Sequence, residues 1–194
     1  MNASPARRTR YGTIAQALHW ATAVLVLVAF IYGPGGNEQR VYSAARDFQR
    51  QLHETLGLGA FMLTALRVLW MAIDRRPESP PAPRWMQIAS KTVHAVLYAL
   101  LFAVPLTAIA GAWLEGHPLT LLAGAEVKPL LAPAHDLGVW LARTHEWLAD
   151  AILWIAGVHA LAAIGHHVIL GDEVLASMLP RGVASRIPRV PREG

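Results

Sequence analysis

The chain has 194 residues, of which 54% are hydrophobic and only 15% are charged, and its formal net charge is +4. Soluble domains usually contain about 25% charged residues, so this composition excludes an ordinary soluble domain and predicts one domain within a membrane. The absence of cysteine excludes disulfides, thiolate-ligated iron–sulfur clusters and thiol catalysis. The arginines lie next to apolar runs, which favours membrane lipid over nucleic acid as the partner of the positive charge.

Four apolar runs follow one another along the chain, each long enough to cross a bilayer. A basic arm, residues 1–13, precedes them and resembles the start of a signal peptide. The run that follows lacks a small-residue cleavage site and contains His19 and Trp20, so we expect a retained first span. The predicted spans are residues 14–32, 52–73, 92–113 and 144–167. We expect Pro105 to kink the third span.

Polar segments separate these spans and set their orientation. Residues 37–51 form an interfacial loop, residues 74–90 a stiff basic loop and residues 114–143 a longer loop, and a tail that is interfacial or loose begins at Gly171. Eleven Lys and Arg residues fall on one side of the membrane and five on the other, which places both termini in the cytoplasm. The sequence therefore predicts an all-α, integral membrane four-helix bundle over residues 14–170, with a cytoplasmic arm (1–13) and a cytoplasmic tail (171–194).

The fourth span contains two histidines, His145 and His159, that are fourteen residues apart. At 3.6 residues per turn this interval is close to four turns, so both imidazoles point to nearly the same side, about 21 Å apart along the axis. The alternating direction of the spans then pairs His53 with His145 near the outer face, and His19 with His159 near the inner face. Facing histidines in a bundle core are a common way to hold a cofactor.

Two histidines on one iron suit a haem that transfers electrons, because both axial positions are filled. Two haems at the two depths would connect the two faces of the membrane. Each histidine alone could equally be a packing residue, and His94 competes with His19 as an inner ligand. Zinc is a weaker alternative: His53-Glu54 and His145-Glu146 resemble the start of an H-E-x-x-H motif, but its second histidine is missing from both.

Two further residues, His166 and Arg67, are expected to have a role in the membrane. His166 lies two turns beyond His159 on nearly the same face, where an imidazole could bond a quinone carbonyl and deliver protons. Arg67 is a cation within the second span and requires a partner, either a haem propionate, a quinone or a backbone carbonyl. His117 and His135 are expected to be solvated loop residues, and His167 has no assigned role.

Four stretches of the chain resemble the bacterial cytochrome b561 family, which comprises small four-span di-haem proteins of the inner membrane. They are QALHWATA, QLHETLGLGAFMLTALRVLW, VHAVLYALLFAVPLTAIAG and THEWLADAILWIAGVHALAAIGHH, the last followed by DEVLASMLPR. The resemblance covers residues 10–181. It implies two haem b groups with axial ligands at His19, His53, His145 and His159. It also implies ubiquinone near the cytoplasmic side, close to His166 and in the vicinity of His94.

Three functions remain open at this stage. In one branch of the family, superoxide is oxidised at the periplasmic face and the electrons reach ubiquinone. Four cations on the outer side would attract the anion or could equally be solvated loop residues: Arg46, Arg50, Lys128 and Arg143. The second function is an electron-transfer subunit that links a dehydrogenase, a redox partner protein, to the quinone pool. The third is a non-redox membrane protein with packing histidines. No catalytic residue is assigned.

Overall fold

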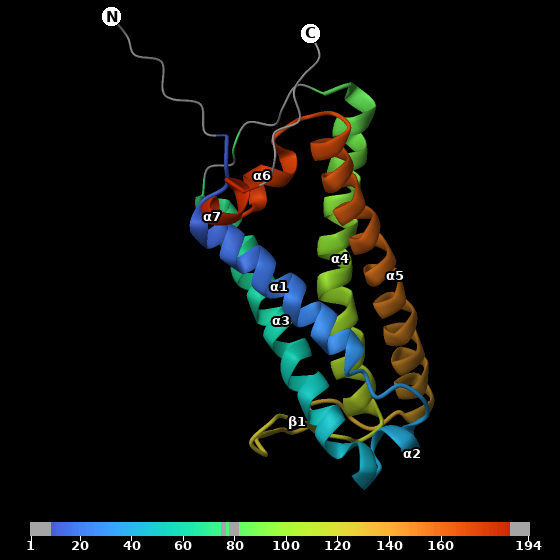
Figure 1. Ribbon diagram of the computed structural model, residues 1–194. Helices are drawn as coiled ribbons and strands as arrows, with labels where there is room; N and C mark the ends of the chain where they lie inside the picture. The colour runs from blue at the N-terminus through green and yellow to red at the C-terminus, as the bar shows by residue number, and fades with distance from the viewer. Residues whose placement is uncertain (1–8, 75–76, 78–81, 187–194) are drawn as a thin grey trace, which may run out of the picture.

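Four long helices dominate the computed structural model, which describes residues 9–74, 77 and 82–186 (Figure 1). The long helices are α1 (Thr13–Ile31), α3 (Asp47–Ile73), α4 (Arg84–Leu114) and α5 (His135–Val168). All four are long and apolar enough to cross a membrane. The predicted all-α membrane bundle of four helices is therefore confirmed.

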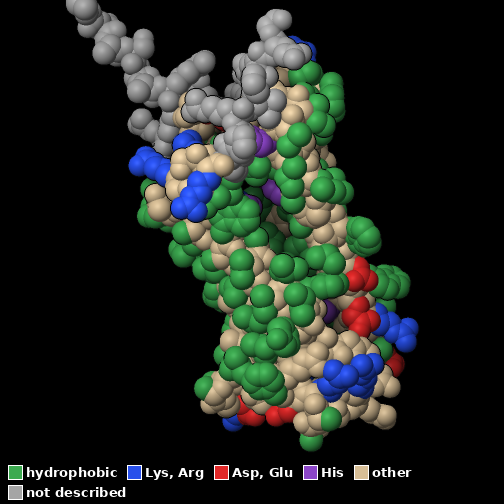
Figure 2. Space-filling model, viewed as in Figure 1, with side chains coloured by type: hydrophobic (Ala, Val, Ile, Leu, Met, Phe, Trp, Pro, Cys, Tyr) green, Lys and Arg blue, Asp and Glu red, His purple; other side chains and the backbone are tan. Residues whose placement is uncertain are grey.

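Apolar side chains cover the outside of the bundle. Leu69, Trp154 and Leu161 are each more than 60% exposed. Side chains of this kind are stable at such positions in contact with lipid tails. Figure 2 shows hydrophobic side chains along the shaft of the bundle, whereas charged side chains gather toward its two ends.

The helices pack as two pairs, α1 with α3 and α4 with α5, and α3 joins the pairs through α4 (Figure 1). Small residues let the helices of each pair approach closely, as is usual between membrane helices. In the first pair Thr22, Ala60 and Thr64 are buried, and the two threonine hydroxyls donate to backbone carbonyls of their own helices. In the second pair a Cβ at Gly138 would lie 2.7 Å from Glu115 Cγ, so only glycine fits there.

One end of the bundle, here called the β end, carries the connections within each pair. The α1–α3 connection contains α2 (Glu38–Val41) and a 3-10 turn, η1 (Ala44–Arg46). The α4–α5 connection contains two short antiparallel strands, β1 (Leu119–Thr120) and β2 (Glu126–Val127). Gly116 lets the chain leave α4, because its φ of +88° lies in the left-handed region that glycine adopts without strain.

The opposite end, here called the tail end, is closed by α6 (Val174–Met178) and α7 (Arg181–Ala184). Side chains from the start of α1 hold α6 through its backbone. Gln16 Nε2 donates to the Ser177 carbonyl at 3.0 Å, and Trp20 Nε1 donates to the Met178 carbonyl at 2.9 Å. This part of the predicted tail is thus packed against the bundle rather than loose.

Three helices begin earlier than the sequence predicts, at residues 47, 84 and 135 instead of 52, 92 and 144. Hydropathy marks the part of a helix inside the hydrocarbon, whereas helical hydrogen bonding continues beyond it. Residues predicted as loop, 84–90 and 135–143, are therefore helical. Helix α4 also continues through Pro105. The predicted loop and terminal cations Arg7, Arg8, Arg75, Arg76, Arg189 and Arg192 lie outside the described residues.

Replacing Gly138 by alanine is expected to lower the midpoint of thermal unfolding of the detergent-solubilised protein. The added Cβ would meet Glu115 Cγ at 2.7 Å and the Glu115 backbone nitrogen at 3.0 Å. Overpacking of this kind costs about 1–3 kcal/mol, more than the roughly 0.5–1 kcal/mol that alanine gains over glycine inside a helix. Gly165→Ala in the same helix is the control, because nothing lies within 4 Å of its added Cβ. Equal midpoints for the two variants would contradict the close packing.

Candidate functional site

The imidazoles of His53 and His145 face each other across the gap between the two helix pairs, near the β end. Their ring centres are 5.9 Å apart, and the ring planes meet at 84°. The Nδ1 of His53 bonds the Ala29 carbonyl of α1 at 2.7 Å, and the Nδ1 of His145 bonds the Val104 carbonyl of α4 at 2.9 Å. A carbonyl only accepts, so each Nδ1 carries the proton and each Nε2 is left as a free electron-pair donor.

A cavity surrounds this pair. It encloses about 800 Å³ of empty space, including its open mouth, between α1, α3, α4 and α5. Its walls are mainly apolar, among them Phe61, Val104 and Leu119. A largely apolar cavity with two inward imidazoles suits a flat, apolar, metal-containing ligand.

A second pair, His19 of α1 and His159 of α5, lies toward the tail end. The ring centres are 6.5 Å apart and the planes meet at 80°. His19 Nδ1 is buried without a hydrogen-bond partner among the described residues. Figure 2 shows histidine side chains in a recess between the helix pairs on this half of the molecule.

The spacing of both pairs matches two imidazoles that share a metal ion. Histidine nitrogens bind metal ions at about 2.0–2.1 Å, which separates the ring centres by roughly 6 Å. His94 also lies near His159, but the ring centres are only 5.0 Å apart, and its Nδ1 bonds the Ser90 carbonyl at 2.6 Å. The geometry therefore favours His19 over His94 as the partner of His159.

Arg67 of α3 lies close to the second pair. Its guanidinium carbon is 5.3 Å from the centre of the Tyr98 ring. The charge acts electrostatically on both His19 and His159. The arginine is thus available to an anionic group bound beside these histidines.

At the tail end, His166 is held by Asp172. Its Nδ1 is 2.5 Å from Asp172 Oδ2, and the Asp172 amide donates to the His166 carbonyl at 3.2 Å. The other carboxylate oxygen accepts from the Val174 amide at 3.0 Å, at the start of α6. Asp172 could not be predicted from the sequence, because it contacts His166 only through the turn that follows α5.

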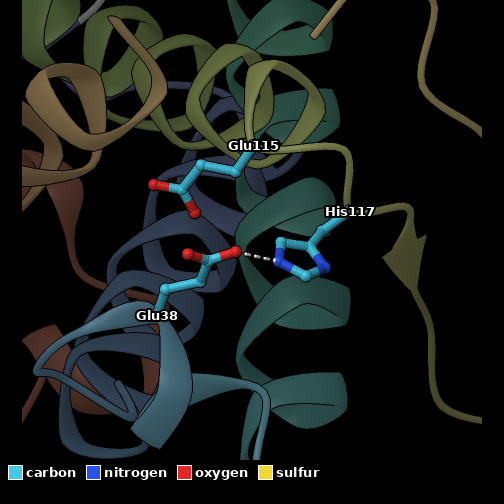
Figure 3. Close-up of side chains that lie close together, drawn as sticks. All are labelled: Glu38, Glu115 and His117. Carbon is cyan, nitrogen blue, oxygen red and sulfur yellow. Dashed lines mark hydrogen bonds and ion pairs between the residues drawn. The ribbon is translucent and has the colours of Figure 1, made fainter. Parts of the chain in front are cut away.

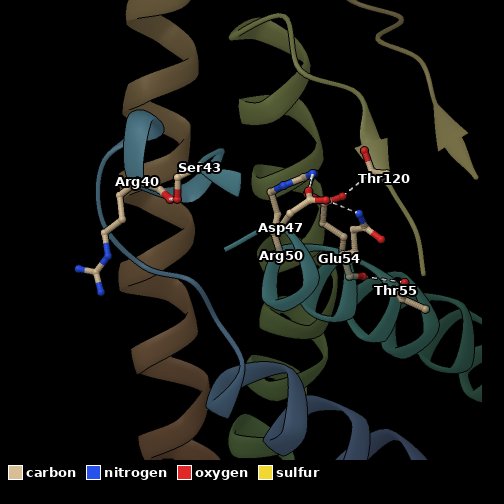
Figure 4. Close-up of polar contacts among 8 residues, drawn as sticks. Arg40, Ser43, Asp47, Arg50, Glu54, Thr55 and Thr120 are labelled. Atoms are coloured by element: carbon tan, nitrogen blue, oxygen red, sulfur yellow. Dashed lines mark hydrogen bonds and ion pairs between the residues drawn. The ribbon is translucent and has the colours of Figure 1, made fainter. Parts of the chain in front are cut away.

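A layer of polar bonds covers the first pair at the β end (Figure 4). Arg50 is buried and donates to Asp47 and to Glu54, the latter at 3.0 Å. Glu54, next to His53, accepts from the Thr120 amide at 2.5 Å and so fixes strand β1 over α3. Arg50 is therefore not a solvated loop residue, and its charge is already paired with two carboxylates rather than left for an anionic donor.

His117 and His135 also differ from the prediction. His117 is not a solvated loop residue: its Nε2 lies 2.6 Å from Glu38 Oε1. Its ring stacks on Tyr42 with centres 3.5 Å apart. His135 is the first residue of α5 rather than a loop residue, although its side chain is exposed. The sequence could not show these contacts, since they join segments about 80 residues apart.

Comparison with known proteins agrees with the histidine pattern. The family model described as prokaryotic cytochrome b561 matches residues 10–181. Cytochrome b561 homolog 2 of Escherichia coli K12 is 30% identical over 171 residues, which is 88% of this chain and 91% of that protein. Cytochrome b561 homolog 1 of the same organism is 28% identical over 171 residues, 84% of this chain and 93% of that protein. A protein of Yersinia pestis named "Probable superoxide oxidase CybB" is 29% identical over 177 residues, 89% of this chain and 97% of that protein.

Membership of a cytochrome family rules out the non-redox alternative. The chain belongs to the prokaryotic cytochrome b561 family and is a bacterial membrane protein that transfers electrons with haem b.

Proposed function

We propose that the chain is a di-haem b oxidoreductase of the bacterial inner membrane that moves electrons between the periplasmic face and ubiquinone. The observation that supports this most directly is the presence of two histidine pairs, with ring centres 5.9 and 6.5 Å apart, at two depths of one bundle. Along α5 the two depths are separated by about 21 Å, the rise of fourteen helical residues. The β end is periplasmic in this proposal, and both termini are cytoplasmic.

The histidines would act as axial ligands in two sets. His53 and His145 would hold one haem b, and His19 and His159 the other. Bound haem b supplies one-electron redox chemistry with both axial positions filled. The Ala29 and Val104 carbonyls fix the tautomer and orientation of the first set and make each Nε2 a better donor. Arg67 would pair with a propionate of the second haem or with the quinone.

Ubiquinone would bind at the tail end, near His166 and with His94 in its vicinity. The bond to Asp172 orients the His166 ring and leaves Nε2 as the atom that exchanges a proton with a quinone oxygen. Reduction of ubiquinone to ubiquinol takes two electrons and two protons, so a proton-conducting group is needed beside the quinone. Asp172 would connect that group to the water at the membrane surface.

Superoxide is the donor that we propose. Two superoxide anions would be oxidised to two dioxygen molecules, and their two electrons with two protons would convert ubiquinone to ubiquinol. The relative named as a probable superoxide oxidase supports this donor. The donor needs no large substrate pocket, because only an electron must enter at the β end.

A docked redox protein is the second candidate donor, and one observation favours it. The β end is not uniformly positive: Arg50 is paired with carboxylates, and Glu38 and Glu115 lie close to each other. Carboxylates at this end weaken the electrostatic attraction of a small anion. In this case the chain would be the cytochrome subunit that connects a dehydrogenase to the quinone pool.

The ligand sets can be tested by haem content and a reduced-minus-oxidised spectrum of the purified protein. We expect two haem b groups per chain in the wild type and about half of that content in His53→Ala and in His19→Ala, because each variant loses one axial ligand. His94→Ala and His167→Ala are the matched controls and should keep both haems. Loss of a haem in His94→Ala, with full content in His19→Ala, would reverse the assignment of the ligand at the tail end.

The donor can be tested with pulsed superoxide and stopped-flow detection of the haem absorbance. In the wild type with ubiquinone present, we expect reduction much faster than in the double variant His53→Ala, His145→Ala, since the double variant lacks the ligands at the β end. Equal rates would exclude superoxide as the donor and favour a protein partner. A chemical reductant that reduces both wild-type haems would show in the same samples that the cofactors are intact.

The quinone site can be tested with His166→Ala and Asp172→Asn. Both variants should keep two haems yet reduce ubiquinone roughly a hundredfold more slowly, within the usual range for loss of a positioned proton donor. His167→Ala, which alters the neighbouring residue on another face of α5, should retain the wild-type rate. Wild-type quinone kinetics in His166→Ala would remove that residue from the site.

A further inference from the structure

Three side chains that the proposed function does not use converge at the β end: Glu38, Glu115 and His117 (Figure 3). Each offers one ligand atom, and these atoms all lie within 4.8 Å of one another. The residues come from different connections of the chain. Glu38 lies in α2, between α1 and α3, whereas Glu115 and His117 directly follow α4.

Local structure holds two of these side chains in place. Glu38 begins a short helix that Asn37 caps by accepting from the Arg40 amide at 3.0 Å. The His117 amide donates to the Ala112 carbonyl at 2.8 Å, which closes the end of α4. The His117 ring also stacks on Tyr42.

The charges of the cluster favour a cation. A carboxylate oxygen of Glu38 lies within 4.8 Å of a carboxylate oxygen of Glu115. Two carboxylates that face each other repel unless a positive group lies between them. His135, at the start of α5, places its Nδ1 3.9 Å from Glu38 Oε2 and can serve as a fourth ligand after a small movement of its exposed side chain.

We propose that Glu38, Glu115 and His117 form a binding site for a divalent transition-metal ion of the zinc type, separate from the haem sites. Two carboxylate oxygens and an imidazole, with His135 as the fourth donor, are a ligand set that Zn²⁺ accepts in tetrahedral geometry. The imidazoles disfavour Mg²⁺ and Ca²⁺, which prefer oxygen ligands. Zinc bonds of about 2.0–2.2 Å would draw these ligand atoms slightly closer together.

The ion would join the two helix pairs. Glu38 belongs to the connection within the α1–α3 pair, whereas Glu115 and His117 belong to the connection within the α4–α5 pair and His135 begins α5. The hydrogen bond between His117 and Glu38 already spans this junction, and a metal ion would replace it with stronger bonds. The ion would also neutralise the carboxylates at the end of the molecule where the proposed electron donor approaches.

Zinc titration of the purified, haem-loaded full chain, with no histidine tag, tests the site. We expect one Zn²⁺ per chain by metal analysis, and an affinity reduced at least tenfold in His117→Ala and in Glu115→Gln. Glu126→Gln, a carboxylate exposed on β2, and His167→Ala at the tail end are controls and should bind as the wild type does. The haem spectrum of each sample, read in parallel, confirms that the variant is folded.

Thermal unfolding gives a second readout, independent of electron transfer. Zinc should raise the unfolding midpoint of the wild type, because a ligand that binds only the folded state stabilises it. A chelator should reverse the shift, and His117→Ala should show none. A wild type that binds no Zn²⁺, or variants that bind it as tightly as the wild type does, would overturn the proposal and leave only the hydrogen bond between His117 and Glu38.

Discussion

The arrangement of this bundle depends on hydrogen bonds between partly buried imidazoles and the backbone of the neighbouring helix. His53 of α3 bonds the Ala29 carbonyl of α1, and His145 of α5 bonds the Val104 carbonyl of α4. In each case the acceptor lies in the other helix of the same pair, so the bond fixes that pair's register and, with it, the direction of the free Nε2. An imidazole at membrane depth that lacked such a partner would be costly to bury.

Each helix pair would supply half of each proposed haem site. Each pair of histidines has one member in α5 and one in the α1–α3 helix pair. Neither helix pair alone therefore contains both histidines of a proposed site. Direct packing between the pairs runs mainly through α3 and α4, and the cavity near the β end lies between them. A cofactor held there would therefore contribute to the association of the two pairs as well as to the chemistry.

Much of the bundle could be predicted from the sequence because the membrane restricts which backbone structures can cross it. A span must be helical and about 20 residues long, and its direction alternates. His159 follows His145 by fourteen helical residues, and this spacing determines both the helix face on which His159 lies and its depth in the membrane relative to His145. The connections are not restricted in this way. Short segments fold back at the bundle ends, and neither hydropathy nor residue spacing predicts how they do so. Three contacts depend on this folding: His117 with Glu38, Glu54 with Thr120, and His166 with Asp172.

Helix α6 is held mainly by its main-chain carbonyls, which accept bonds from Gln16 and Trp20 of α1. Every residue carries the same carbonyl, so the side chains at positions 177 and 178 can change during evolution without loss of these two bonds, provided that the turn keeps its shape. Helix α1 therefore binds the backbone of α6, and these bonds do not depend on which side chains α6 carries. Asp172 directly precedes this segment and accepts a bond from the Val174 amide at its start, so the fold of the segment also helps to hold Asp172 against His166, where we propose that the quinone binds.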